Sequence, residues 1–385
     1  MSGRSGTSRQ EAYLIELVAS TVNQQDPILG TEHPAWGWLY KMSDYHHVSN
    51  LVYYKIMWED GRDARIWKEK FELRYREALR QQERYEALRV RLEEELEQDQ
   101  IHSIFLGEML VLGYYPRPEM RMPETLQIQV ERKHVFKARK ILERIGFEAE
   151  KDKEGRETGV YTQIPDLKVE IREKLPFTAK ETRVWFQDFP RILPRKTGRH
   201  YIHYLNGETL YIYLLCRLAE KYARGLAEIR DMVDLWLFLS KEGPGLKWKE
   251  IQEEVESLKL DLFSEYVIKL TGSWFGRMYF QEDMEFLEDM RTYIFSKGAE
   301  ARKANEMILP LVKVVADNYY RDLEKEEKEK QRKWTFPSLD YMAASFPKLK
   351  KWPFLLPFYW WVRILRQRRF RRKQQEKQEK EGNQT

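Results

Sequence analysis

The sequence has little of what several common kinds of site require. Its 385 residues include a single cysteine, Cys216, which excludes an intrachain disulfide and a thiolate metal cluster. Cys216 lies in the apolar segment 210–218, where we expect a buried, inert thiol. The histidine pairs His46-His47 and His200/His203 have no third ligand within sequence reach, so they do not predict a metal site.

Further absences concern location and phosphate binding. No segment approaches the ~18 apolar residues that a membrane span needs, and the N-terminus lacks the apolar region of a secretion signal. We therefore expect a cytoplasmic protein. The sequence has no glycine-rich phosphate loop, because Gly243-Pro244-Gly245 is typical of a turn, and it has no serine or cysteine nucleophile motif.

Charge and aromatic residues, in contrast, are plentiful. Charged residues make up 34% of the chain and aromatic residues 14%, a combination that favours a globular protein with solvated helices over disorder. The net charge of +5 is uneven: residues 361–385 hold nine Lys/Arg and three Glu, a charge of +6, which leaves −1 for the rest. Binding to nucleic acid or phospholipid is therefore predicted for this tail and hardly for the body.

Periodicity predicts an α+β fold. Helical patterns fill 11–56, with breaks at prolines and near His46-His47, and 64–100, which contains neither glycine nor proline. Short strands are predicted within 101–171, with one helix at 133–145 that Gly146 ends. Helices return after Asn206, and 321–333 is a charged helical run. We expect a small mixed sheet with packed helices, and four regions: 1–100 helical, 101–205 α/β, 206–335 helical, and 336–385 a Pro/aromatic segment with a basic tail.

A series of short motifs along this pattern resembles one family. The motifs are Leu106-Gly107, Tyr115-Pro116-Arg117-Pro118-Glu119-Met120-Arg121, Thr125-Leu126-Gln127-Ile128, Val169-Glu170-Ile171-Arg172, Arg230 with Asp234, and a C-terminal Pro353-Phe354-Leu355-Leu356-Pro357 with Arg363. In order and spacing they resemble the uncharacterised nucleotidyltransferase family of the polymerase-beta-like superfamily, from about residue 10 to about 366. The resemblance implies a nucleotidyltransferase-like sheet.

The departures from the family pattern fall on its charged residues. The family's lysine falls on Leu106, its Asp-x-Asp pair on Thr125 and Gln127, and its histidine after the strand glutamate on Arg172. Two further family histidines fall on Arg217 and Tyr222. Glu170 alone occupies a family carboxylate position, and it is the one remnant catalytic candidate.

This loss bears directly on metal chemistry. Nucleotidyl transfer requires Mg²⁺ held by carboxylate oxygens, and alternation would put an Asp-x-Asp pair on one strand face. Here that face carries Thr125, Gln127 and Gln129. Glu124 points to the opposite face, and Glu131 lies roughly 13 Å beyond Gln127 at ~3.3 Å per residue. We therefore predict no metal site, with Mg²⁺ as cofactor only if the protein is active.

The other site candidates each have two interpretations. Glu170 is either a catalytic remnant or a salt-bridge partner of Lys168 or Arg172, its neighbours on the same strand face. Arg230 and Asp234 either form a simple i,i+4 helix pair or line a substrate cleft together with Gly107. Arg121 is either a phosphate contact in that cleft or a structural cation that closes the proline loop.

The basic tail leaves three alternatives open. The apolar and aromatic segment 354–361 precedes a basic cluster that comprises Arg363, Arg366, Arg368, Arg369, Arg371, Arg372 and Lys373. The segment can pack on the body of the protein and leave the cluster as a solubilising tail. Alternatively the pair binds an anionic membrane surface, making the protein membrane-peripheral, or the cluster binds nucleic acid without specificity.

Three functions follow as hypotheses. The first is a catalytically impaired member of the family that acts by binding a nucleotide or a protein partner. The second is an active Mg²⁺-dependent nucleotidyltransferase that uses Glu170 and an acid that the sequence does not identify. The third is a peripheral membrane or scaffold protein that acts through its tail.

Overall fold

The computed structural model describes residues 2–29, 34–59, 61–152, 155, 157–164, 166–175, 177–187 and 193–296. The chain divides into two compact units, residues 1–319 and 320–385, and every described residue belongs to the first. The expected helix 321–333, the Pro/aromatic segment and the basic tail lie outside the described residues. The domain boundaries near 100, 205 and 335 stay a prediction.

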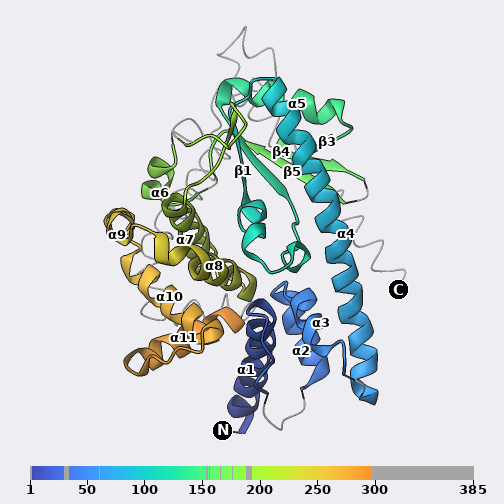
Figure 1. Ribbon diagram of the computed structural model, residues 1–385, viewed down its shortest axis with the longest axis vertical. Helices are drawn as coiled ribbons and strands as arrows, with labels where there is room; N and C mark the ends of the chain where they lie inside the picture. Colours follow the sequence, from blue (N-terminus) through green and yellow to red (C-terminus); the bar gives the residue numbers. More distant parts are fainter. Residues whose placement is uncertain are drawn as a thin grey trace, which may run out of the picture. The chain divides into compact units, whose positions relative to one another are not determined.

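The described residues form a mixed six-stranded sheet with the strand order β3-β4-β5-β2-β1-β6 (Figure 1). β2 pairs in parallel with β5 and antiparallel with β1, and β6 joins β1 in parallel. The strands are β1 (Ser103–Leu106), β2 (Leu126–Val130), β3 (Glu148–Lys151), β4 (Glu157–Gln163), β5 (Leu167–Arg172) and β6 (Ile202–His203). The expected α+β fold with a small mixed sheet is confirmed. β6 was not predicted, because two residues are too few to show alternation.

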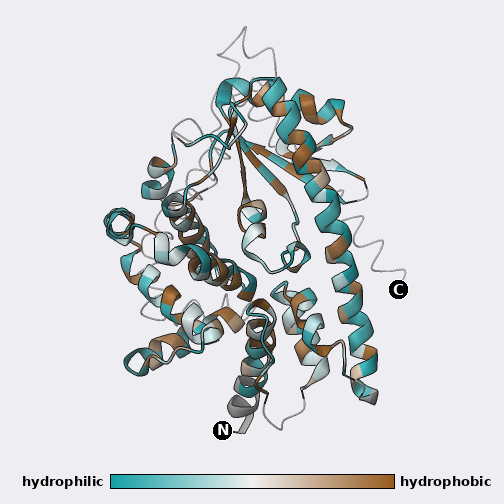
Figure 2. Cartoon of the chain, in the orientation of Figure 1, coloured by the Kyte–Doolittle hydropathy of each residue, from teal (hydrophilic) through white to brown (hydrophobic). Residues whose placement is uncertain are grey.

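Four helices precede the sheet in the chain, namely α1 (Ser2–Val22), α2 (Trp36–Tyr45), α3 (Ser49–Ile56) and α4 (Arg62–Gln98). The predicted break at His46-His47 is confirmed, and His47 adopts the left-handed conformation there with φ 54°. For 64–100 the sequence predicted one long helix or two helices with a smooth joint, and the structure has one helix, because α4 runs without a break through a segment free of glycine and proline. Figure 2 shows α4 as largely hydrophilic, with hydrophobic residues spaced along it.

The remaining described helices include five that follow predicted segments and two, at 180–185 and 284–295, that the sequence did not predict. They are α5 (Val135–Arg144), α6 (Lys180–Trp185), α7 (Gly207–Ala223), α8 (Ile229–Glu242), α9 (Trp248–Ser257), α10 (Asp261–Phe275) and α11 (Met284–Phe295). α7 begins where the Asn206 side chain accepts a hydrogen bond from the Thr209 amide at 3.0 Å. Cys216 is buried in α7, and this burial raises the pKa of its thiol to about 12, as expected for an inert cysteine. None of the described helices combines the length and apolar content that a bilayer crossing demands.

The sheet has one apolar face and one polar face near β2. Leu126, Ile128 and Val130 lie in a hydrophobic core together with residues of α4 and α5 such as Leu92 and Ile141. Each such side chain stabilises the fold by about 1.5–3 kcal/mol when it is fully buried. The alternation predicted for β2 is therefore confirmed, and its polar residues face away from this core.

Candidate functional site

The strand register brings together the positions that matched the family motifs. Gln127 on β2 lies beside Leu106 on β1 and beside Glu170 on β5. Three neighbouring strands thus carry Leu106, Gln127 and Glu170 side by side. In the family pattern these positions hold a lysine and two acids. The structure joins these sequence-distant positions as the resemblance implies.

Gly107 closes this polar face next to Gln127. Its φ of 71° lies in the left-handed region that favours glycine. A Cβ on this residue would lie 3.0 Å from the Gln127 Oε1 atom and 3.6 Å from Nη1 of Arg217. Arg217 on α7 therefore reaches the same face of the sheet, and glycine allows the close approach.

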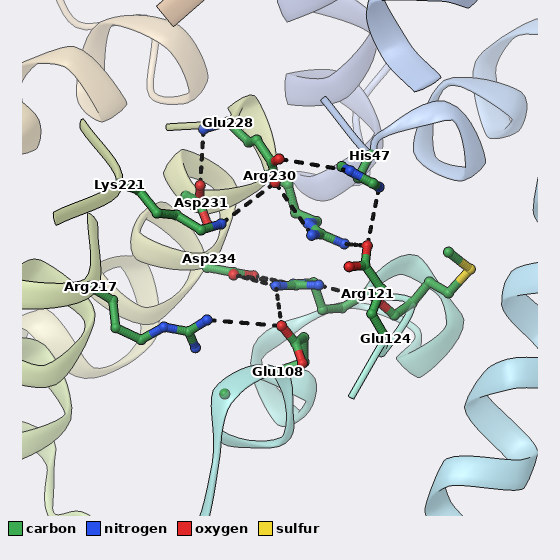
Figure 3. Close-up of polar contacts among 12 residues, drawn as sticks. His47, Glu108, Arg121, Glu124, Arg217, Lys221, Glu228, Arg230, Asp231 and Asp234 are labelled. Atoms are coloured by element: carbon green, nitrogen blue, oxygen red, sulfur yellow. Dashed lines mark hydrogen bonds and ion pairs between the residues drawn. The ribbon is translucent and has the colours of Figure 1, made fainter. Parts of the chain in front are cut away.

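Glu108 is a functional candidate that the sequence prediction missed. A short 3₁₀ turn (η1, Gly107–Leu110) follows β1 and buries its carboxylate 3.8 Å from Arg121 and 4.0 Å from Arg217 (Figure 3). Burial by itself raises the pKa of this carboxyl, but Arg121, Arg217 and Arg230 outweigh it and hold the pKa below its ordinary value. Glu108 is therefore ionised at neutral pH. Its position directly after Gly107 was the available signal.

Arg121 and Asp234 form the buried centre of the site. Arg121 donates from Nε to Asp234 Oδ1 at 2.8 Å and from Nη2 to Oδ2 at 3.0 Å, and the Tyr115 hydroxyl donates to Oδ1 at 2.7 Å. The same loop is fixed from outside, because the Asn50 amide donates to the Glu119 carbonyl at 2.8 Å. Both ends of the Tyr115–Arg121 loop thus converge on one carboxylate of α8.

Arg230 belongs to a second set of ion pairs beside this centre. It lies 2.9 Å from Glu124 and 3.3 Å from Glu228, while His47 contacts the same two carboxylates at 3.1 and 3.7 Å (Figure 3). The interpretation of Arg230 and Asp234 as an i,i+4 helix pair is wrong, because Asp234 pairs with Arg121 and Arg230 pairs with Glu124 and with Glu228 at the start of α8. The two residues lie on α8 but join different networks.

A third ion pair joins α8 to α7. Lys221 on α7 is 2.6 Å from Asp231 on α8. Burial raises the pKa of this aspartate, but Lys221 and the nearby arginines lower it further, so the net effect is a pKa far below the ordinary range. Asp231 also caps α8 by accepting from the Glu228 amide at 2.9 Å.

Glu170 forms a salt bridge with Arg172, as one of its two interpretations predicted. In this pair the arginine side chain is 39% exposed and the glutamate 11%. The pair of Arg217 and Glu108 repeats this order, with 27% and 10%. At both places the arginine side chain is more exposed than the glutamate side chain.

The donor set at this face does not fit Mg²⁺. Thr125 and Gln127 offer neutral oxygens, and the one carboxylate of the strand face, Glu170, is held by Arg172. Within the described ranges, no three His, Cys, Asp or Glu side chains converge as a metal ion would require. Hard divalent cations need several carboxylate oxygens, and this face of the sheet does not supply them.

The sequence profile of a family described as uncharacterised nucleotidyltransferase matches residues 32–276, more than half of the chain. The chain belongs to this family. No curated protein and no solved structure matches it. The match to the uncharacterised nucleotidyltransferase family spans α2 to the end of α10 and includes every residue of the site. The wider resemblance inferred from the C-terminal motifs lies outside it.

Proposed function

We propose that this member of the uncharacterised nucleotidyltransferase family binds a phosphate-bearing ligand, a nucleotide in the first place, without metal-dependent nucleotidyl transfer. The observation that carries this proposal is the order of charges at the polar face of β2. The Arg217 and Arg172 side chains are more exposed than the Glu108 and Glu170 side chains beside them, so the arginines are more accessible to a ligand from solvent. This order suits an anion and opposes a cation.

The chemistry of the guanidinium group supports the same proposal. Arginine presents a planar fork of donors that matches phosphate oxygens, whereas transfer chemistry needs carboxylates that bind metal ions. Arg121 is 3% exposed and forms a close ion pair with Asp234. Arg217 is 27% exposed, and its distance of 4.0 Å from Glu108 makes this a weaker ion pair. Arg217 is therefore the cation that a phosphate group can recruit at the lowest cost.

The binding test is calorimetry of ATP with and without EDTA. We expect ATP to bind at least as tightly without Mg²⁺ as with it, and Arg217→Gln to weaken binding about tenfold, a loss of ~1.4 kcal/mol. Arg277→Gln is the matched control, because Arg277 is 42% exposed and pairs with Glu16 away from the site. Binding that requires Mg²⁺, or equal affinity in both variants, would contradict the proposal.

The alternative is an active enzyme that uses Glu170 together with Glu108 as the second acid. Purified protein incubated with four α-labelled NTPs, Mg²⁺ or Mn²⁺ and a cell lysate would then label an acceptor repeatedly. We expect no such labelling. Sustained turnover that Glu170→Gln and Glu108→Gln each abolish would favour the enzyme and overturn our proposal.

Two further roles are proposed separately. The site can bind a protein partner in place of a nucleotide, and the tail can bind a membrane. The tail carries +6 in residues 361–385, which suits a peripheral attachment of a cytoplasmic protein to anionic lipid. Liposome flotation of the full chain and of a chain ending at residue 357 tests this. Equal partitioning of the two proteins would remove the membrane role.

A further inference from the structure

A polar pocket lies beside the site. Its lining includes neither Arg217 nor Arg172. It has a volume of about 300 Å³ and is lined by residues of α2, α3, α4 and the loop 122–124. This volume is at the lower end of the range for small-molecule sites. The loop leads directly into Thr125 and β2, so the pocket adjoins the polar face of the sheet.

The charged side chains of the pocket leave a surplus of acid. Arg74 lies 2.7 Å from Asp44 and 2.9 Å from Glu77, so one guanidinium serves two carboxylates. Glu124 adds a third carboxylate, which Arg230 contacts at 2.9 Å and His47 at 3.1 Å. Arg74 is thus the one arginine or lysine among the pocket-lining residues, against three acids.

An independent observation comes from Gln81 on α4, which also lines the pocket. Its Nε2 donates to Asp166 Oδ2 at 3.0 Å, and this bond fixes the orientation of the amide. Its Oε1 atom is buried and has no hydrogen-bond partner within the part of the chain that the structure describes. A buried acceptor without a partner costs about 1–3 kcal/mol, which a ligand that donates a hydrogen bond recovers.

We infer that this pocket binds a small molecule that carries a protonated primary amine. An ammonium group supplies three donors and a positive charge, which match the unpaired Gln81 acceptor and the surplus carboxylate of Asp44 and Glu77. A phosphate or carboxylate ligand would instead add negative charge beside Asp44 and Glu77, two carboxylates that share the single guanidinium of Arg74. The inference stands apart from the proposed nucleotide binding, because it uses neither Arg217 nor Arg172.

The test compares three probes with the same four-carbon chain. Calorimetry or saturation-transfer NMR is run on the full chain with 1,4-diaminobutane, 1,4-butanediol and succinate. We expect the diamine to bind and the diol and succinate to bind at least about fivefold more weakly, as loss of one close charge interaction predicts. Equal binding of diamine and diol, no binding of the diamine, or preferred binding of succinate would each overturn the inference.

Variants locate the binding. Glu77→Gln is expected to weaken the diamine about fivefold or more, whereas Glu250→Gln, at a 63% exposed position on α9, leaves it unchanged. Gln81→Met, which removes the unpaired acceptor, is the second variant and is used if Glu77→Gln fails to fold. Unchanged affinity in the folded variants would contradict the site. Arg217→Gln and added pyrophosphate leave diamine binding unaltered, so a failure of nucleotide binding is recognised separately.

Discussion

The guanidinium group of Arg121 holds both carboxylate oxygens of Asp234, although the two residues lie 113 positions apart in the chain. The pair joins the loop before β2 to α8, and both side chains are less than a tenth exposed. It thereby fixes the polar loop of the sheet against the C-terminal helices. This geometry agrees with the interpretation of Arg121 as a structural cation that closes the proline loop.

Removal of this carboxylate should destabilise the protein strongly. Asp234→Ala leaves the Arg121 charge buried without its partner, and loss of one member of a buried pair costs about 3–5 kcal/mol. Glu265→Gln is the control, since Glu265 is 55% exposed in its pair with Lys269 and an exposed pair contributes at most about 1 kcal/mol. Urea unfolding measures both values, and similar losses would contradict the structural role.

Glycine at position 107 should be essential to the local structure. Gly107→Ala introduces a side chain at φ 71° whose Cβ lies 3.0 Å from the Gln127 amide oxygen. We expect a loss of about 1–2 kcal/mol from the backbone alone, with added strain at Gln127. Gly113→Ala, where a Cβ meets no atom within 4 Å, should change the stability by less than about 0.5 kcal/mol.

Stability should fall as the pH is lowered below the ordinary carboxylate range. The pKa of Glu108 is held below its ordinary value in the folded state, because the three arginines outweigh the effect of burial. Its contribution is therefore complete above the unfolded value of 4.5 and is lost as the pH falls through the folded value. Urea midpoints between pH 7 and pH 3 should show a smaller pH dependence in Glu108→Gln. An identical dependence would show that Glu108 is not stabilised as an anion.

The charge order at β2 predicts how metal binding can be regained. Thr125→Asp with Gln127→Asp gives three acids together with Glu170, but Arg172 still occupies the Glu170 carboxylate. We expect little Mg²⁺ binding from this double variant. Adding Arg172→His, the residue that the family pattern has there, should increase the affinity at least about tenfold, or ~1.4 kcal/mol.

Calorimetry with Mg²⁺ decides between the outcomes. No gain in the triple variant would mean that the site has diverged beyond these three positions. Equal gains in the double and triple variants would show that Arg172 is not the obstacle.

The amino-acid sequence by itself determined most of the helices and strands of this protein and the faces that they bury, but not β6, α6 or α11. The lack of glycine and proline in 64–100 specified either one long helix or two with a smooth joint, and strict alternation in 125–131 put Leu126, Ile128 and Val130 into the core. Both follow from local periodicity, which a single chain segment carries. The resemblance of short motifs likewise sufficed to identify the family.

The partners of the charged residues were decided only by the tertiary structure. Sequence spacing suggested that Arg230 pairs with Asp234, whereas the fold gives Asp234 to Arg121 and Arg230 to Glu124. Glu108 became a candidate only when α7 brought Arg217 to it. An ion pair forms only between elements that the fold brings together. A long charged side chain can reach several partners, and no local sequence pattern tells which of them it contacts.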